Sequence, residues 1–348
     1  MNLRAVSLLA CCFVPETTNA QDTAVVLPPP FTRDAGRLAS LRLHEIAAIE
    51  IPTTGGMTRQ LEFTADAGFL VLAADERLYV HELATGTVHQ RAFDGVLTDS
   101  LGDARIGLVE DGVARVYCAA TRRIVAEHAL VRPDSRPFPM LLAPQVSAAR
   151  FDPQGTGLFL SYLDLNTPIP TGSTYRFDFG DNRLREVVPG QCLQHIVRLV
   201  DGRIFVQGRK PVRCARAPDE GVIVTVDRDG RASKNLANQY APVTSDVSWD
   251  QRHFTWSDGR YVHRCRLDDG RVVQERFAAV YWWHMLDPVL ALTHDGERFS
   301  VWHEPTMTSG PDLAGPWPSI DYATLSRRGR MLGAITKGML RVWRIDRD

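Results

Sequence analysis

The sequence predicts an all-β protein, a seven-bladed β-propeller of four-stranded antiparallel blades. Three observations lead to this prediction: a pattern of short strands and polar turns that recurs seven times, a near absence of long helical periods, and an incomplete last repeat matched by a spare strand near the N-terminus. In each repeat a bulky apolar residue precedes a polar turn and an apolar strand. The seven anchors of this pattern are Phe63, Leu101, Phe151, Leu199, Trp249, Leu286 and Leu325.

The intervals between consecutive anchors have the length of propeller blades. They are 38, 50, 48, 50, 37 and 39 residues, and blades recur at about 40–50 residues. Because the blades of a propeller share one continuous core, such a chain forms a single domain. We therefore expect one propeller domain over residues 41–348, and the 44% of hydrophobic residues is enough for its core.

The first repeat shows its strands most clearly. An apolar strand is expected at 69–74, a second strand at 78–83 and an outer strand at 87–93, each separated from the next by a short turn. Together with the segment that ends at Phe63, they make the four strands of one antiparallel blade. Short polar turns between β-rich runs are typical of such meanders, so each later repeat is expected to have the same plan.

The second repeat is expected to align with the first without a gap. Sixteen residues separate Phe63 from Tyr79, and sixteen separate Leu101 from Tyr117. Later repeats keep the plan with insertions, and each has a turn with Gly or Asp between two β-rich runs. Their clearest segments are 151–163, 199–208, 249–265, 288–304 and 325–345.

The two ends of the propeller are expected to complete one blade. The last repeat stops after three strands, and residues 43–51 form an extended stretch without a hairpin partner of its own. Pairing these ends would close the ring and remove the exposed strand edges that favour aggregation. The predicted ring is therefore closed by the N-terminal strand, which pairs with the last blade.

Residues 1–20 have the layout of a secretory signal peptide. Arg4 supplies a positive charge, residues 5–14 are apolar, and Ala20 precedes a plausible cleavage point, while the apolar run is too short to span a bilayer. Residues 21–40 contain three consecutive prolines and are expected to be a linker. We expect a secreted or periplasmic protein without a membrane span, and a cytoplasmic protein is the alternative if the segment is retained.

The net charge and the cysteine content limit which partners and metal sites are expected. The net charge is −1 and the basic residues are scattered, so no nucleic-acid partner is expected. Four cysteines follow the signal segment without CxxC spacing, so a zinc site is not expected. Cys192 and Cys214 share a repeat and are the expected pair in an oxidising compartment, with buried free thiols as the alternative. The other two are Cys118 and Cys265.

Four segments resemble the third strands of WD-repeat proteins. The closest is RVWRID at 341–346, and more distant versions are SVWHE at 300–304, LYVHEL at 78–83 and ARVYCA at 114–119. No repeat carries the Gly-His pair of that family, and no third strand ends in Trp-Asp. The chain thus resembles a degenerate WD-repeat-like propeller, and the resemblance implies a fold rather than an activity.

The sequence contains no recognisable catalytic motif. Its ten histidines form no His-Glu-x-x-His pair, no Gly-x-Ser-x-Gly elbow is present, and no glycine-rich phosphate loop leads into a helix. His81, His263 and His303 are expected on third strands as ordinary blade residues. These observations favour a non-enzymatic scaffold that binds a protein or peptide and needs no cofactor.

Two long connections form the predicted binding site. Residues 131–145 join the second blade to the third, and residues 303–321 join the sixth to the seventh. Both join an outer strand to an inner strand, so both emerge on one face of the ring, and loops of this length are usually functional or disordered. Arginine and aromatic residues dominate interface hot spots. The predicted contacts are Arg132, Arg136, Phe138, Met140 and Trp317.

A small-molecule or metal site in the central channel is the alternative function, which would make the chain an exported propeller enzyme or a subunit of one. Polar residues of innermost strands would line this channel and offer oxygen and imidazole ligands, although pairing of the acidic residues with arginines is the simpler arrangement. A structural role within a larger assembly is a third reading. The predicted channel residues are Glu62, Arg150, Arg198, Asp246, His284 and Asp321.

Overall fold

The structure is a computed structural model, and it consists almost entirely of strands. The residues that it describes are 41–51, 60–130, 145–151, 157–164, 171–188, 192–199, 201, 203–210, 220–227, 229, 231–236, 243–286, 288–313, 320–326, 329–336 and 338–347. Within these ranges the one helical segment is a 3₁₀ turn, η1 (Glu304–Thr306). No helix in this part of the chain has the length and apolar character needed to cross a membrane.

The strands of the described residues group into seven antiparallel sheets, six of four strands and one of three. Sheet 1 contains β2 (Gln60–Phe63), β3 (Phe69–Ala74), β4 (Arg77–Glu82) and β5 (Val88–Ala92). Sheet 2 contains β6 (Gly95–Gly102), β7 (Arg105–Glu110), β8 (Val113–Cys118) and β9 (Arg123–Ala129). Sheet 3 contains β10 (Gln145–Phe151), β11 (Gly157–Asp164), β12 (Thr171–Asp178) and β13 (Arg183–Val188), and sheet 4 contains β14 (Cys192–Arg198), β15 (Ile204–Lys210) and β16 (Glu220–Val226). Sheet 5 contains β17 (Thr244–Val247), β18 (His253–Ser257), β19 (Tyr261–Arg266) and β20 (Val272–Phe277). Sheet 6 contains β21 (Trp282–Met285), β22 (Leu290–His294), β23 (Phe299–His303) and β24 (Thr308–Asp312), and sheet 7 contains β25 (Ile320–Leu325), β26 (Met331–Thr336), β27 (Met339–Arg347) and β1 (Leu41–Glu50).

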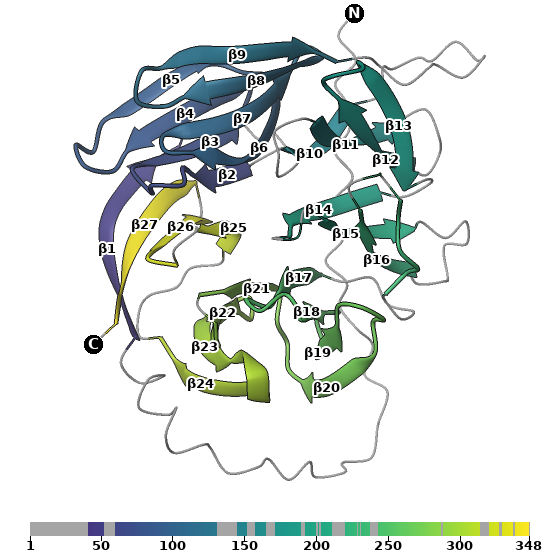
Figure 1. Cartoon of the computed structure of the whole chain (residues 1–348). Coiled ribbons are helices and arrows are strands. Elements are labelled where there is room, and N and C mark those ends of the chain that lie inside the picture. The colour runs from purple at the N-terminus through teal and green to yellow at the C-terminus, as the bar shows by residue number, and fades with distance from the viewer. Residues whose placement is uncertain are drawn as a thin grey trace, which may run out of the picture.

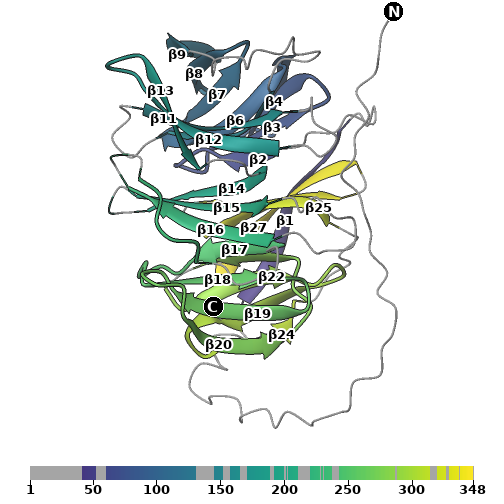
Figure 2. The same cartoon turned by 90° about the vertical axis from the view of Figure 1, so that its right-hand side faces the viewer.

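The sheets are arranged around a common axis, like the blades of a propeller (Figure 1). In sheets 1 to 6 the first strand, such as β2 or β17, lies on the inner side, and the later strands lie progressively further out. In sheet 7 the innermost strand is β25 and the outermost is β1. The view from the side shows sheets 3, 4 and 5 following one another in chain order from top to bottom (Figure 2). The all-β propeller that the sequence predicts is therefore confirmed.

Apolar side chains fill the space between neighbouring sheets. Leu72 of β3 packs with Leu61 and with Ile335 of sheet 7 on one side of sheet 1. The preceding residue, Val71, packs with Leu108 of sheet 2 on the other side of sheet 1. Because successive residues of a strand point to opposite faces, a strand between two such cores must be apolar on both. This requirement explains the continuous apolar run of β3.

Strand β1 joins the two ends of the described chain. It pairs antiparallel with β27, from Leu41 opposite Arg347 to Glu50 opposite Met339. A cross-strand ion pair accompanies the ladder, since Nη1 of Arg341 lies 2.8 Å from Oε2 of Glu45. This is the pairing that the incomplete last repeat and the spare strand predict.

The first two sheets align differently from the gapless alignment expected from the sequence. Tyr79 is the third residue of β4, and the third residue of β8 is Arg115. Tyr117 is the fifth residue of β8 and therefore corresponds to His81. The offset arises in β6, whose pairing with β7 shifts register on both sides of Ser100, because each bulge adds an unpaired residue to a strand.

Trp249 is an anchor that the structure places outside the core. It lies in the turn after β17 and is 51% exposed. Val247 takes the place that Phe63 has in sheet 1, because Val247 pairs with Phe254 as Phe63 pairs with Leu70. The expected anchor of the fifth repeat is thus two residues too late.

The three histidines expected on third strands are found there, His81 in β4, His263 in β19 and His303 in β23. The ring of His263 stacks on Trp256 with centroids 4.2 Å apart, and its Nδ1 lies 2.9 Å from Oε2 of Glu275. Its contacts are therefore with residues of its own sheet.

The inner edge of a sheet has no strand partner, and side chains of a neighbouring sheet bind it. Oε1 of Gln60 in sheet 1 accepts a hydrogen bond from the N–H of Leu97 in sheet 2, at 2.6 Å. Oδ1 of Asp99 in sheet 2 accepts one from the N–H of Phe151 in sheet 3, at 3.1 Å. Buried backbone donors need such partners, so these side chains fix the relative positions of neighbouring sheets.

A buried ion pair joins sheets 5 and 6. Glu304, in η1 between β23 and β24, is 1% exposed. Its Oε1 accepts a hydrogen bond from Nε of Arg264 in β19 at 2.7 Å, and the hydroxyl of Thr255 in β18 lies 3.4 Å away. Removing one partner of a buried pair leaves the other charge without compensation.

Replacing Glu304 by Ala is therefore expected to lower the free energy of unfolding by about 3–5 kcal/mol. Denaturant unfolding of the full chain measures the change. Asp312→Ala is the matched control, because it breaks an exposed ion pair with Arg298, at 3.0 Å, and should cost less than about 1 kcal/mol. Equal, small effects of the two variants would contradict a stabilising role for the buried pair.

Candidate functional site

The strand order gives the ring two different faces. Neighbouring strands of a sheet are antiparallel, so the turns between second and third strands lie on the same face as the connections from one sheet to the next first strand. We call this face 1. Face 2 carries the turns between first and second strands, where Trp249 lies, and those between third and fourth strands.

The predicted partner contacts lie outside the described residues. Those in the first long connection fall within 131–144, and the one in the second falls within 314–319. The second connection was expected at 303–321, but residues 304–312 form η1 and β24, so it begins only after Asp312. The bordering strands are described: β9 ends at Ala129 and β10 begins at Gln145, both at face 1. The assignment of these connections to face 1 follows from the strand order, and their contacts stay predictions. The residues concerned are Arg132, Arg136, Phe138, Met140 and Trp317.

On face 1, Tyr281 lies across the turns of two neighbouring sheets. A Cβ built on Gly259, between β18 and β19, would stand 3.4 Å from the tyrosine ring, and one built on Gly296, between β22 and β23, would stand 3.5 Å from it. The side chain of Val243 stands 3.5 Å from the Cβ built on Gly259. Tyr281 is nevertheless 51% exposed and Val243 38% exposed. One side of the ring thus rests on backbone while the other faces solvent.

The two turns beneath this ring have the same construction. Gly259 and Gly296 have φ values of +87° and +103°, a region that favours glycine. Asp258 Oδ1 accepts hydrogen bonds from the two N–H groups that follow Gly259, at 2.8 and 2.6 Å. Asp295 Oδ1 binds the two N–H groups after Gly296 at 2.8 and 2.7 Å. Such aspartate-capped turns hold their backbone in one conformation.

A second group of exposed aromatic side chains adjoins the first turn. Tyr261 and Phe277 pair across β19 and β20, with ring centroids 5.4 Å apart and the planes at 77°. The guanidinium carbon of Arg260 lies 5.8 Å and 5.9 Å from the two centroids. Phe277 is 70% exposed. We call this set the aromatic surface, and its members are Val243, Arg260, Tyr261, Phe277 and Tyr281.

The aromatic surface was not expected from the sequence. Tyr281 precedes an inner strand, whereas its two supporting glycines belong to different repeats. The available signal was the pair of Asp-Gly turns at 258–259 and 295–296 on either side of an aromatic residue. Alone, each turn indicates only a tight hairpin.

Four of the six predicted channel residues occupy one position in their strands. Each is second from the end of a first strand, so all four lie at one level near face 2. They are Glu62 of β2, Arg150 of β10, Asp246 of β17 and His284 of β21. Arg198 ends β14 and Asp321 lies in β25, but the side chains of both are outside the described part of the chain.

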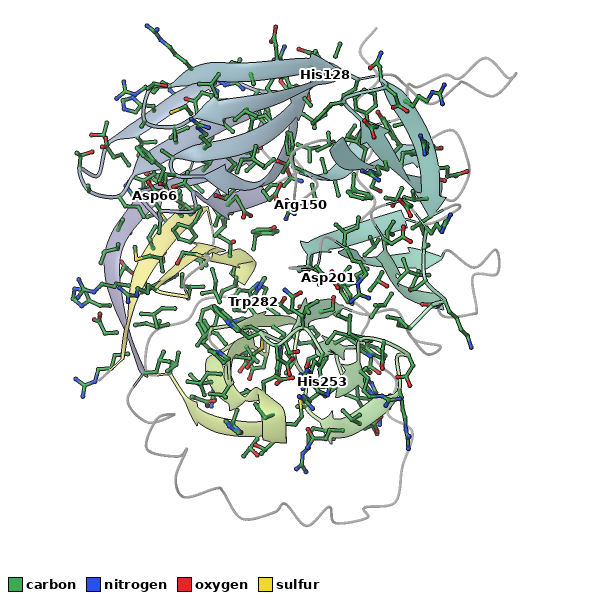
Figure 3. The ribbon with its side chains drawn as sticks, viewed as in Figure 1. Asp66, His128, Arg150, Asp201, His253 and Trp282 are labelled. Carbon is green, nitrogen blue, oxygen red and sulfur yellow. The ribbon has the colours of Figure 1, made fainter. Side chains whose placement is uncertain are left out.

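Asp246 and His284 form an ion pair between sheets 5 and 6. Nδ1 of His284 lies 3.2 Å from Oδ2 of Asp246, which also accepts a hydrogen bond from the N–H of Met285 at 3.0 Å. Burial opposes ionisation of Asp246, but the hydrogen bond and the charge of His284 outweigh it and lower the pKa of this carboxyl. The ring of Trp282 lies 4.7 Å from that of His284, and Figure 3 shows Trp282 and Arg150 near the middle of the ring.

Among the predicted channel residues, Glu62 has a carboxyl group with a raised pKa. Burial raises the pKa of Glu62 to about 7, while Arg150 lowers it, Asp99 raises it and His284 lowers it. Burial, followed by the charge of Glu62, also raises the pKa of Tyr322, against the effect of Arg150. We call these interacting side chains the axial cluster, and they are Glu62, Asp99, Arg150, Asp246, His284 and Tyr322.

The remaining groups that could carry chemistry are metal-ligating side chains and thiols. Among them, no group of three His, Cys, Asp or Glu residues is arranged to hold a metal ion. Cys118 and Cys265 are free, and burial raises the pKa of Cys265 to about 11. The side chains of Cys192 and Cys214 lie outside the described part, so their pairing stays a prediction.

Replacing Glu62 by Gln is expected to change how stability depends on pH. Because the pKa of Glu62 is about 7 in the folded protein and 4.5 ordinarily, the folded state holds this proton more tightly and loses stability as pH rises between these values. Relative to Glu62→Gln, the unaltered protein should lose about 1–3 kcal/mol of unfolding free energy over that window. Denaturant unfolding at about pH 5 and about pH 8 measures this, and parallel curves for the two proteins would contradict the raised pKa.

Comparison with known proteins supports the fold. The sequence matches no known protein family and no curated protein at a significant level. The structure is similar to the crystal structure of the β-propeller domain of Cps50 (Swd1) from Myceliophteria thermophila, with a TM-score of 0.59 over 87% of this chain and 100% of that chain, at 12% sequence identity. At this identity the similarity shows architecture alone, and that architecture is a β-propeller.

Proposed function

We propose that this protein is a non-enzymatic scaffold that binds another protein or a peptide on face 1 of its propeller. The observation that carries the proposal is the seating of Tyr281, half-exposed on the glycine turns of two neighbouring sheets. Aromatic and arginine side chains supply most of the energy in interfaces. Exposed apolar side chains that cluster mark interaction sites more often than scattered ones do.

Preorganisation makes this surface suitable for binding. Ordering a mobile side chain on binding costs about 0.5–1.5 kcal/mol. The ring of Tyr281 already rests against the turns at Gly259 and Gly296, so less of this cost falls on association. The connection from β9 to β10 and the connection from β24 to β25 belong to the same face, and the predicted contacts within them extend the proposed binding site beyond the aromatic surface.

The proposal also covers the number of blades and the closure of the ring. The seven sheets are the blades of a closed, degenerate WD-like propeller, in which β1 completes the last blade. The pairing of β1 with β27 supports this closure. In sheet 4, the N–H groups of Ser233 and Leu236 donate to the carbonyls of Thr225 and Ile223 at 2.7 and 2.6 Å. These bonds favour residues 232–236 as the fourth strand of that blade.

Replacing Tyr281 by Ala is expected to weaken peptide binding at least about tenfold, because truncating a hot spot costs about 2 kcal/mol or more. Short random peptides displayed on phage are selected on the immobilised full chain, and the affinities of synthetic versions are then measured. Trp249→Ala is the matched control, since Trp249 is also 51% exposed but lies on face 2, and its affinities should not change.

The reverse result would refute the assignment. If independently selected peptides bound Tyr281→Ala as tightly as the unaltered protein, or lost affinity only with Trp249→Ala, face 1 would not be the binding face. Thermal unfolding of both variants establishes that the loss of affinity is not a loss of folding.

A further inference from the structure

Arg260 is held above the aromatic surface by two rings. Its guanidinium carbon lies 5.8 Å from the ring centroid of Tyr261 and 5.9 Å from that of Phe277. A guanidinium at such distances is attracted by the ring faces and is weakly hydrated for a cation. The charge of Arg260 is therefore presented at a defined place on face 1, although the residue is exposed.

No carboxylate of the described residues lies within ion-pair distance of Arg260, and the acidic groups around it have other partners. Asp258 binds the backbone N–H groups of Arg260 and Tyr261. Glu275, in β20, lies 2.9 Å from Nδ1 of His263. By contrast, Arg298 in the turn region of sheet 6 is paired with Asp312 at 3.0 Å. Arg260 is thus a cation of the aromatic surface whose hydrogen-bonding capacity is available to a partner.

The occupant that fits this arrangement carries a carboxylate beside a large apolar side chain. Arg binds carboxylates in a bidentate geometry that Lys cannot reproduce. The exposed ring of Tyr281 and the side chain of Val243 both lie beside Gly259, the residue before Arg260 in the same turn. An apolar side chain on this ring would place its neighbour in the peptide close to the guanidinium.

We propose that the aromatic surface binds a linear peptide segment in which an Asp or Glu stands next to a large apolar residue. The carboxylate binds the guanidinium of Arg260, and the apolar side chain packs on Tyr281. This inference rests on the proposed function and adds the chemistry of the partner to it. Glu297 is exposed and follows Gly296 in the turn of sheet 6, so its negative charge is expected to oppose such a partner.

The experiment uses the full chain and peptides selected on it from a random displayed library. Synthetic peptides are compared with versions in which the Asp or Glu is replaced by Asn or Gln. The acidic version should bind about tenfold more tightly than the amide version, because a hydrogen bond to a charged group is worth more than a neutral one. The difference should shrink as salt is added, since salt screens exposed charges.

Protein variants assign the effect to Arg260. Arg260→Ala should bind the acidic and amide peptides equally, Arg260→Lys should keep part of the preference, and Glu297→Gln should strengthen binding of the acidic peptide. Arg298→Ala is the control, because Arg298 already has a carboxylate partner, and it should keep the full preference.

The outcomes separate this inference from the function on which it rests. If the amide peptides bind as well as the acidic ones while Tyr281→Ala still abolishes binding, the acidic partner is wrong and the binding face stands. If the preference for the acid survives in Arg260→Ala, the role of Arg260 is wrong. If selected peptides are insensitive to Tyr281→Ala, or the library yields none, both proposals fail.

Discussion

The open inner edge of each sheet is the constraint on which the structure depends. The first strand of a sheet has a partner on one side only, so the backbone N–H groups of its other side need acceptors from elsewhere. Side chains of the neighbouring sheet supply them, as Gln60, Asp99 and Asp246 do. Each such bond fixes one sheet against the next. The apolar cores between the sheets then stabilise an arrangement that these polar contacts have oriented.

The consequence for function is clearest between sheets 5 and 6. Along the inner strands, Asp246 and Thr244 bind backbone N–H groups of β21. Further out, the buried pair of Glu304 and Arg264 joins the same two sheets. Sheets 5 and 6 are therefore held together both close to the propeller axis and further from it. On face 1 their turns support the ring of Tyr281 from both sides. A rigid inter-sheet junction thus becomes a preorganised exposed surface, which is the physical basis of the proposed scaffold function.

Local features could be predicted from the sequence, whereas contacts between repeats could not. Alternating strands and turns predicted the sheets and the spare N-terminal strand, because hairpins are set by nearby residues. The residues before the anchors, such as Glu62, led to the predicted channel set, which stays a prediction. The bulges around Ser100 and the exposure of Trp249 were missed, since register and burial depend on the neighbouring sheet. The two glycine turns that support Tyr281 belong to different repeats, so no local sequence pattern predicts this arrangement.

The claim that face 1 is the binding face is tested most directly by hydrogen exchange of the full chain with and without a selected peptide. The account predicts slower exchange at the amides of the two turns beneath Tyr281, residues 258–261 and 295–298, and at Tyr281, whose N–H binds the carbonyl of His294 at 2.9 Å. Unchanged exchange there, with slowing instead at the turns of face 2 around Asp66 and Asp250, would contradict it.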